Sequence, residues 1–118
     1  MQLLTEVLTG PEKLCKHNLI KGEKFKKNGD LESFDQVCLV GAIAVVTGHL
    51  CRIPQGEIKP TNFINVRDIM SEVVQEMYPK FYGYIPGFNN HRDTTFEDIY
   101  AVAKETDRRL QLQQWEKV

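Results

Sequence analysis

The sequence lacks any long apolar run: no stretch approaches the roughly 20 residues that a helix needs to cross a bilayer. Residues 1–6 contain neither a basic region nor a long apolar segment, so no secretory signal is visible. Cysteine is scarce, with 3 residues, and in the absence of a secretory signal these are expected to be reduced thiols. We therefore expect a cytoplasmic protein with no membrane partner.

Internal repeats, low-complexity segments and linkers rich in Gly, Ser or Pro are also missing. Together with a length of 118 residues, their absence predicts a single globular domain over residues 1–118. A hydrophobic content of 42% and an aromatic content of 9% are typical of a folded globule rather than a disordered chain.

Neither sign of charge is in excess, because 15 Lys and Arg residues against 16 Asp and Glu residues leave a net charge of -1. Dedicated nucleic-acid binders carry an excess of positive charge that displaces counterions from phosphates, so a nucleic-acid partner is not expected. The most basic stretch holds Lys21, Lys24, Lys26 and Lys27. Acidic neighbours dilute it, so we interpret it as a solvated loop, with contact to RNA or DNA phosphates as the alternative.

One segment, residues 37–46, is apolar on nearly all sides. A helix without a polar face belongs in the centre of a domain, and the length of this run favours a helix over a buried strand. Ser33 and Gln36 have the spacing of a capping box, and Asp35 is a competing N-cap. We expect a buried central helix at about residues 36–47.

Amphipathic helices are expected around this central helix. Residues 3–8 and 66–77 carry apolar side chains at helical spacing. The last helix is expected to begin at Thr94 or Thr95, and Thr94 has capping-box spacing with Glu97. These elements predict a mainly α fold.

Two short segments carry turn signals. Residues 27–30, with the sequence Lys-Asn-Gly-Asp, predict the turn of at most one small β-hairpin. Pro86 and Gly87 predict a type II turn, in which Gly tolerates the positive φ.

A dense polar run, Asn89, Asn90, His91, Arg92 and Asp93, precedes the last helix. The N-terminus of a helix is a natural position for binding an anion or an amide, so Asn89, Asn90, His91 and Arg92 are candidate residues for contact with a ligand or partner. The alternative is a structural role, in which the Asn and Asp side chains satisfy the amides of their own turn and cap the helix.

A cysteine nucleophile is a second candidate. Cys38 lies near the start of the predicted central helix, where free backbone N–H groups stabilise a thiolate. His91 would serve as the base, with Asp93 or Asn89 orienting it, as in cysteine hydrolases. The alternative is that Cys38 is a small buried apolar side chain.

A metal site is a third candidate. Cys15, His17, His49 and Cys51 could supply two sulfur and two nitrogen ligands to zinc. A spacing of two does not place both side chains on one side of a helix, and Cys-x-x-Cys and His-x-x-x-His spacings are absent. We therefore expect no metal and no cofactor.

The order of the motifs resembles an uncharacterised family of small proteins met in bacteriophages, actinobacteria and other bacterial genomes. The resemblance rests on Ile20-Lys21-Gly22, Cys38-Leu39-Val40-Gly41-Ala42-Ile43, Phe88-Asn89-Asn90, Thr94, Thr95 and Asp98-Ile99. The family pattern is aromatic-Cys-x-x-Gly-Ala, then aromatic-Asn-Asp before a Thr-capped final helix. The chain departs from it at Val37, where an aromatic residue is usual, and at Asn90, where Asp is usual.

The resemblance implies a bacterial or phage protein of the host cytosol and implies no activity. Our leading hypothesis is therefore a small, non-enzymatic accessory protein that acts by binding a partner protein. Inhibition of a host defence system is one concrete form. The alternatives are a small cysteine-dependent enzyme that uses Cys38 and His91, and a module centred on Asn89–Arg92 that binds a small anion or nucleotide.

Overall fold

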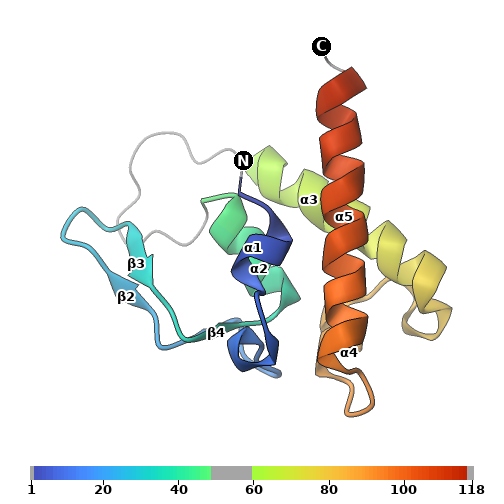
Figure 1. Ribbon diagram of the computed structural model, residues 1–118, viewed down its shortest axis with the longest axis horizontal. Coiled ribbons are helices and arrows are strands. Elements are labelled where there is room, and N and C mark those ends of the chain that lie inside the picture. The colour runs from blue at the N-terminus through green and yellow to red at the C-terminus, as the bar shows by residue number, and fades with distance from the viewer. Residues whose placement is uncertain (1, 49–59, 117–118) are drawn as a thin grey trace.

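The computed structural model describes residues 2–48 and 60–116 of the chain, and its helices are joined by a few short strands (Figure 1). The α-helices are α1 (Leu4–Val7), α2 (Leu39–Val46), α3 (Pro60–Met77), α4 (Ile85–Asn90) and α5 (Phe96–Glu116). The strands are β1 (Ile20–Lys21), β2 (Lys24–Phe25), β3 (Leu31–Ser33) and β4 (Gln36–Val37), and the 3-10 turns are η1 (Pro11–Lys13) and η2 (Pro79–Phe81). The prediction of a mainly α fold with a small hairpin is confirmed.

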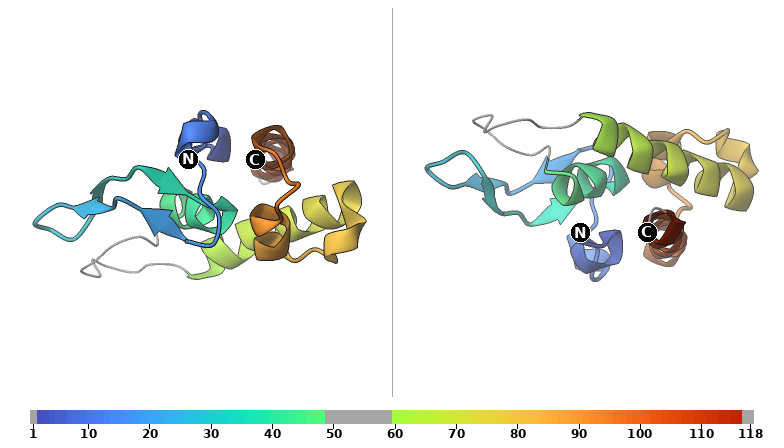
Figure 2. Two further views of the ribbon diagram at one scale, coloured as in Figure 1. Left: turned by 90° about the horizontal axis from the view of Figure 1, so that it is seen from below. Right: turned by 90° about the horizontal axis from the view of Figure 1, so that it is seen from above.

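The helices form two layers. Figure 2 shows α1 and α5 side by side in one layer, over a second layer that contains α2, α3 and α4. The hydrophobic core lies between them, and it includes Leu4 of α1, Ile43 of α2, Val73 of α3, Phe88 of α4 and Val102 of α5, all almost fully buried. Because α2 contacts α1, α3 and α4, the prediction of a buried central helix is confirmed in position.

The hairpin is formed by β2 and β3, which project away from the helices (Figure 1). Phe25 lies opposite Leu31, and the backbone N–H of Lys26 donates to the carbonyl of Asp30 at 2.8 Å. Gly29 has a φ of 93°, a left-handed conformation that glycine adopts without strain. The predicted turn at residues 27–30 is therefore confirmed.

The start of the central helix was predicted wrongly. Residues 36–37 form β4, in which Val37 pairs with Ile20 of β1, and α2 begins only at Leu39. Ser33 lies in β3 and does not cap a helix; the N-cap is Cys38, whose sulfur accepts a hydrogen bond from the backbone N–H of Gly41 at 3.3 Å. The pairing with β1 holds these residues in an extended conformation, so a long-range contact overrides the local cap signal.

Gly41 allows the strands to approach α2 closely. A Cβ atom at this position would lie 2.0 Å from the carbonyl oxygen of Leu19, and that oxygen accepts a hydrogen bond from the N–H of Cys38 at 3.1 Å. Any side chain at residue 41 would therefore push the segment that precedes β1 away from the N-terminus of α2.

The predicted type II turn at Pro86 and Gly87 is also wrong, because both residues lie in the first turn of α4. Proline suits the first turn of a helix, where its missing N–H would have no intrahelical partner. The chain instead turns just before α4, where Tyr82 and Gly83 have φ values of 54° and 75°.

The last helix, α5, is capped by Thr95, one of the two residues predicted to start it. The hydroxyl oxygen of Thr95 accepts from the N–H of Asp98 at 3.2 Å, and the Asp98 carboxylate accepts from the N–H of Thr95 at 3.0 Å. The hydrogen bond from the Thr95 backbone lowers the pKa of Asp98. The expected capping box of Thr94 and Glu97 is therefore wrong by one residue, and Thr94 is buried instead.

Candidate functional site

Asn89, at the end of α4, joins three segments of the chain. Its side chain is buried, with 1% of its surface exposed. Its amide oxygen accepts from the backbone N–H of Leu39 at 3.0 Å, and its amide nitrogen donates to the carbonyl of Cys15 at 3.1 Å. Asn89 therefore fixes α4 against both the start of α2 and the segment that follows η1.

Asn90 extends this junction to His17. The Asn90 side-chain oxygen accepts from the backbone N–H of His17 at 2.8 Å and from the Asn89 amide at 3.0 Å. His17 has a φ of 67°, a left-handed conformation that is uncommon for residues with a side chain. Both bonds use the side-chain oxygen of residue 90 as acceptor. An aspartate at this position would supply the same acceptor oxygen.

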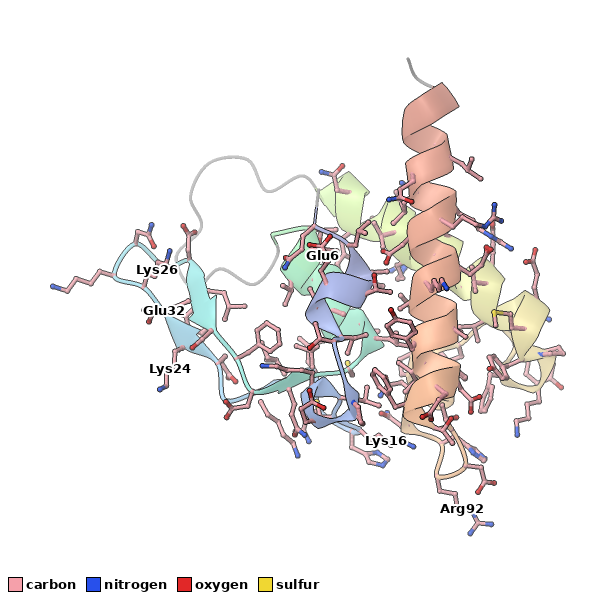
Figure 3. All side chains as sticks on the ribbon, in the orientation of Figure 1. Glu6, Lys16, Lys24, Lys26, Glu32 and Arg92 are labelled. Carbon is pink, nitrogen blue, oxygen red and sulfur yellow. The ribbon has the colours of Figure 1, made fainter. Side chains whose placement is uncertain are left out.

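Lys16 is a structural residue that the sequence pattern did not reveal. Its ammonium donates to the carbonyl of His91 at 2.5 Å and to the carbonyl of Thr94 at 2.8 Å. Figure 3 shows Lys16 reaching toward the loop that joins α4 to α5. The side chain thus closes this loop from a segment about 75 residues earlier in the chain. In the sequence Lys16 resembles any other surface lysine.

The second half of the polar run faces solvent. The His91 ring packs edge-on to Phe81, with ring centres 5.4 Å apart, and its Nδ1 accepts from the backbone N–H of Asp93 at 3.1 Å. Arg92 lies at the tip of the loop (Figure 3), where its side chain is 91% exposed and 3.9 Å from the Asp93 carboxylate. The structure therefore separates His91, Arg92 and Asp93 from the junction that Asn89 forms.

A surface hollow lies beside the junction. Its volume is about 240 Å³, and its lining includes Cys38, Asn89 and Asn90 together with His17 and Leu19. Val40 and Pro86 complete one side of it. Two of the predicted site residues, Asn89 and Asn90, are thus brought together with Cys38.

A second hollow adjoins the first, because Val40 and Pro86 line both. Its volume is about 400 Å³, and its other lining residues include Phe63 of α3 and Tyr84, which precedes α4. We call the two adjoining hollows the groove. Sequence reasoning missed Val40 and Tyr84, although the aromatic cluster around residue 82 was a signal for exposed binding side chains.

The structure places Cys38 and His91, the predicted nucleophile and base, in different surroundings. Within the described part of the chain, the hollow that Cys38 lines includes His17 and does not include His91. His91 packs on Phe81 instead, and Asp93 interacts with His91 and Arg92 in the exposed loop. The Cys38 thiol itself is half-buried and accepts its hydrogen bond from Gly41.

Within residues 2–48 and 60–116 no group of three or more His, Cys, Asp or Glu side chains is placed to hold a metal ion. Of the four zinc candidates, His49 and Cys51 lie outside the described residues, and Cys15 donates its thiol hydrogen to the carbonyl of Asn18. In the same described part of the chain, no helix combines the length and apolar character needed to span a membrane.

A larger hollow of about 470 Å³ lies between α1 and α5. Asp107 in its lining is buried and already used: its carboxylate accepts from the backbone N–H groups of Leu4 and Thr5 at 2.8 and 3.1 Å. Glu105 and Arg108, which also line this hollow, form an ion pair with each other. Asp107 therefore holds α1 on α5, the charges of Glu105 and Arg108 are paired within α5, and the groove remains the better candidate site.

Comparison with curated proteins and with solved structures gives no match. A family model does match, over residues 6–109, and its description is "Family of unknown function (DUF6197)". The matched residues include the whole Asn89 junction and all the lining residues of the groove. The chain therefore belongs to the family of unknown function DUF6197.

Proposed function

We propose that this protein acts without catalysis, by binding a segment of a partner protein in the groove. The observation that carries the proposal is that two adjoining hollows share Val40 and Pro86 in their linings. Two adjoining depressions suit a chain segment that places one side chain in each.

The rim of the groove carries large apolar side chains that remain exposed. Tyr84 is 65% exposed, Leu19 is 45% exposed, and neighbouring Tyr82 is 87% exposed. Tyrosine is enriched among the residues that dominate binding energy at protein interfaces, because it supplies a large rigid surface and a hydroxyl. Arg67 and Asp68 in the second hollow pair with each other at 3.4 Å, so their charges do not favour a highly charged ligand.

The size of the first hollow supports a side chain rather than a whole small molecule as its occupant. Its volume of about 240 Å³ lies below the roughly 300–1,000 Å³ of most small-molecule sites. The junction also uses the amide of Asn89 internally. Both observations favour partner binding over the alternative of a nucleotide-binding module centred on Asn89–Arg92.

The proposal extends to the setting of the protein. On the resemblance to phage and bacterial proteins, we propose an accessory protein of the bacterial host cytosol, and inhibition of a host defence system as one form of its action. The cysteine-dependent enzyme is the less favoured alternative, because Cys38 and His91 lie in different surroundings.

The test begins with a photo-crosslinking amino acid in place of Tyr84, introduced in living bacteria, to identify and then purify the captured protein. Its affinity is then measured by calorimetry for the wild type, for Tyr84→Ala and for the control Tyr100→Ala. Tyr100 is also exposed, but it lies on α5, away from the groove.

We expect Tyr84→Ala to weaken binding by about tenfold or more, and Tyr100→Ala to change it by less than about twofold. Equal losses in both variants, or a captured protein that does not bind the purified chain, would contradict the proposal.

A further inference from the structure

Cys15 and Cys38 occupy neighbouring positions on adjacent extended segments. Leu14 and Val37 form a parallel bridge, and the N–H of Cys15 donates to the carbonyl of Val37 at 3.0 Å. Cys15 and Cys38 are the next residues on each side of this isolated bridge. Just beyond them the Asn89 amide joins the carbonyl of Cys15 to the N–H of Leu39, in place of a further backbone hydrogen bond. Cys38 continues the extended backbone, with a φ of -88° and a ψ of -179°.

This register suits a disulfide. Paired strands lie about 4.8 Å apart, and the two cysteines directly follow a bridged pair. Their side chains are close enough for Cys38 to affect the pKa of Cys15, which it raises after the larger effect of burial. The Cα atoms of disulfide-bonded cysteines are usually about 4.4–6.8 Å apart, so the two thiols can be joined without a large backbone movement.

The two thiols differ in access. Cys15 is buried, with 4% of its surface exposed, whereas Cys38 is half-buried and lines the first hollow of the groove. The pKa of Cys15 is raised mainly by burial and further by the neighbouring Cys38, while Lys21 offsets part of this increase. A small reagent in the hollow therefore meets Cys38 before Cys15.

We propose that Cys38 is a site of oxidation by hydroperoxides and that Cys15 resolves the oxidised form as a disulfide. The Cys38 sulfur attacks a peroxide oxygen, the O–O bond breaks, and Cys38 becomes a sulfenic acid while water or an alcohol leaves. The Cys15 sulfur then attacks the Cys38 sulfur, the S–O bond breaks, and a water leaves. With hydrogen peroxide, two thiols become one disulfide, and the peroxide is reduced to two waters.

The disulfide would change the start of α2. The Cys38 sulfur now accepts the N–H of Gly41 and so caps the helix. Bonded to Cys15, that sulfur would be drawn toward the segment that follows η1, on the side of the hollow lined by His17 and Asn18. The modification therefore alters the wall of the groove directly.

The test uses a Cys51→Ser chain, because Cys51 lies outside the described residues. The folded protein is treated with hydrogen peroxide, free thiols are blocked, and intact mass and non-reduced peptides are analysed by mass spectrometry. We expect a mass loss of two hydrogen atoms, a Cys15–Cys38 linked peptide, and recovery of both thiols with dithiothreitol.

Two further variants in the same background assign the order of the steps. With Cys15→Ser, we expect dimedone to trap a sulfenic acid on Cys38 and no disulfide to form. Cys38→Ser retains an oxygen for the helix cap. In this variant we expect Cys15 to oxidise at least about tenfold more slowly than Cys38 does in Cys15→Ser, because burial shields Cys15.

Three outcomes would overturn the proposal. The first is a Cys38 that accumulates as sulfinic acid while Cys15 stays a free thiol. The second is a Cys15 that oxidises equally fast without Cys38. The third, in the wild-type chain, is a disulfide that joins Cys38 to Cys51 in preference to Cys15.

Discussion

One polar run of the sequence divides into two regions that differ in what they contact. The first is Asn89 and Asn90 at the end of α4, and the second is His91 to Asp93 in the loop that follows. The two asparagines bond to the start of α2 and to residues 15–17. Within the described part of the chain, the next three side chains make contacts within residues 91–93 or with Phe81, and Arg92 points into solvent (Figure 3). The difference shows that polarity in the sequence does not separate an internal hydrogen-bonding hub from an exposed loop.

The largest effect is expected at the hub. Asn89→Leu leaves the N–H of Leu39 and the carbonyl of Cys15 buried without partners, and each such group costs about 1–3 kcal/mol. We expect the free energy of unfolding to fall by about 2–5 kcal/mol, measured by urea denaturation. The control is the double variant Arg92→Ala, Asp93→Ala, which should stay within about 0.5 kcal/mol of the wild type. Similar losses in both proteins would remove the distinction between the two regions.

A smaller effect is expected at Lys16, which supports the loop between α4 and α5 from a distant segment of the chain. Lys16→Met removes the charged hydrogen bonds to the carbonyls of His91 and Thr94 and retains much of the apolar stem. We expect a loss of about 1–3 kcal/mol in unfolding free energy. Lys24→Met, on the exposed hairpin (Figure 3), is the matched control and should change stability by less than about 0.5 kcal/mol. If the two variants are equally stable, Lys16 does not support the loop.

The smallest effect is expected at Asn90, where two variants distinguish the role of the side-chain oxygen from that of the amide nitrogen. Asn90→Ala removes the acceptor used by His17 and should cost about 0.5–1.5 kcal/mol. Asn90→Asp retains that acceptor, so we expect thermal denaturation to show less than half of the loss in Asn90→Ala. A more severe loss in Asn90→Asp would mean that the amide nitrogen is required.

Local patterns predicted the regular parts of the fold well. The apolar spacing over residues 66–77 gives the C-terminal two-thirds of α3, and the Asn28-Gly29 signal gives the hairpin turn. These features succeed because they depend on neighbours within one turn of helix or hairpin. Thr95 was one of two cap candidates, and the carboxylate of Asp98 decided between them.

Two of the failures depend on contacts distant in sequence. Residues 36–37 form a strand because β1 lies beside them, and this pairing has no signal in the local cap pattern. The reach of Lys16 to the loop before α5 is equally invisible. For the site, the sequence selected Cys38, Asn89 and Asn90 as notable residues. It could not show that they share a hollow with His17 rather than with His91.

The central claim is that Cys38 belongs to the groove and is chemically independent of His91. The most direct measurement is the rate at which a soluble reagent alkylates Cys38, followed by peptide mass spectrometry across pH in the wild type and in His91→Ala. We predict rates at Cys38 that agree within about twofold at every pH, because His91 is engaged with Phe81 and Asp93 instead. A rate at Cys38 that falls by about tenfold or more in His91→Ala would contradict this account and favour a catalytic pair.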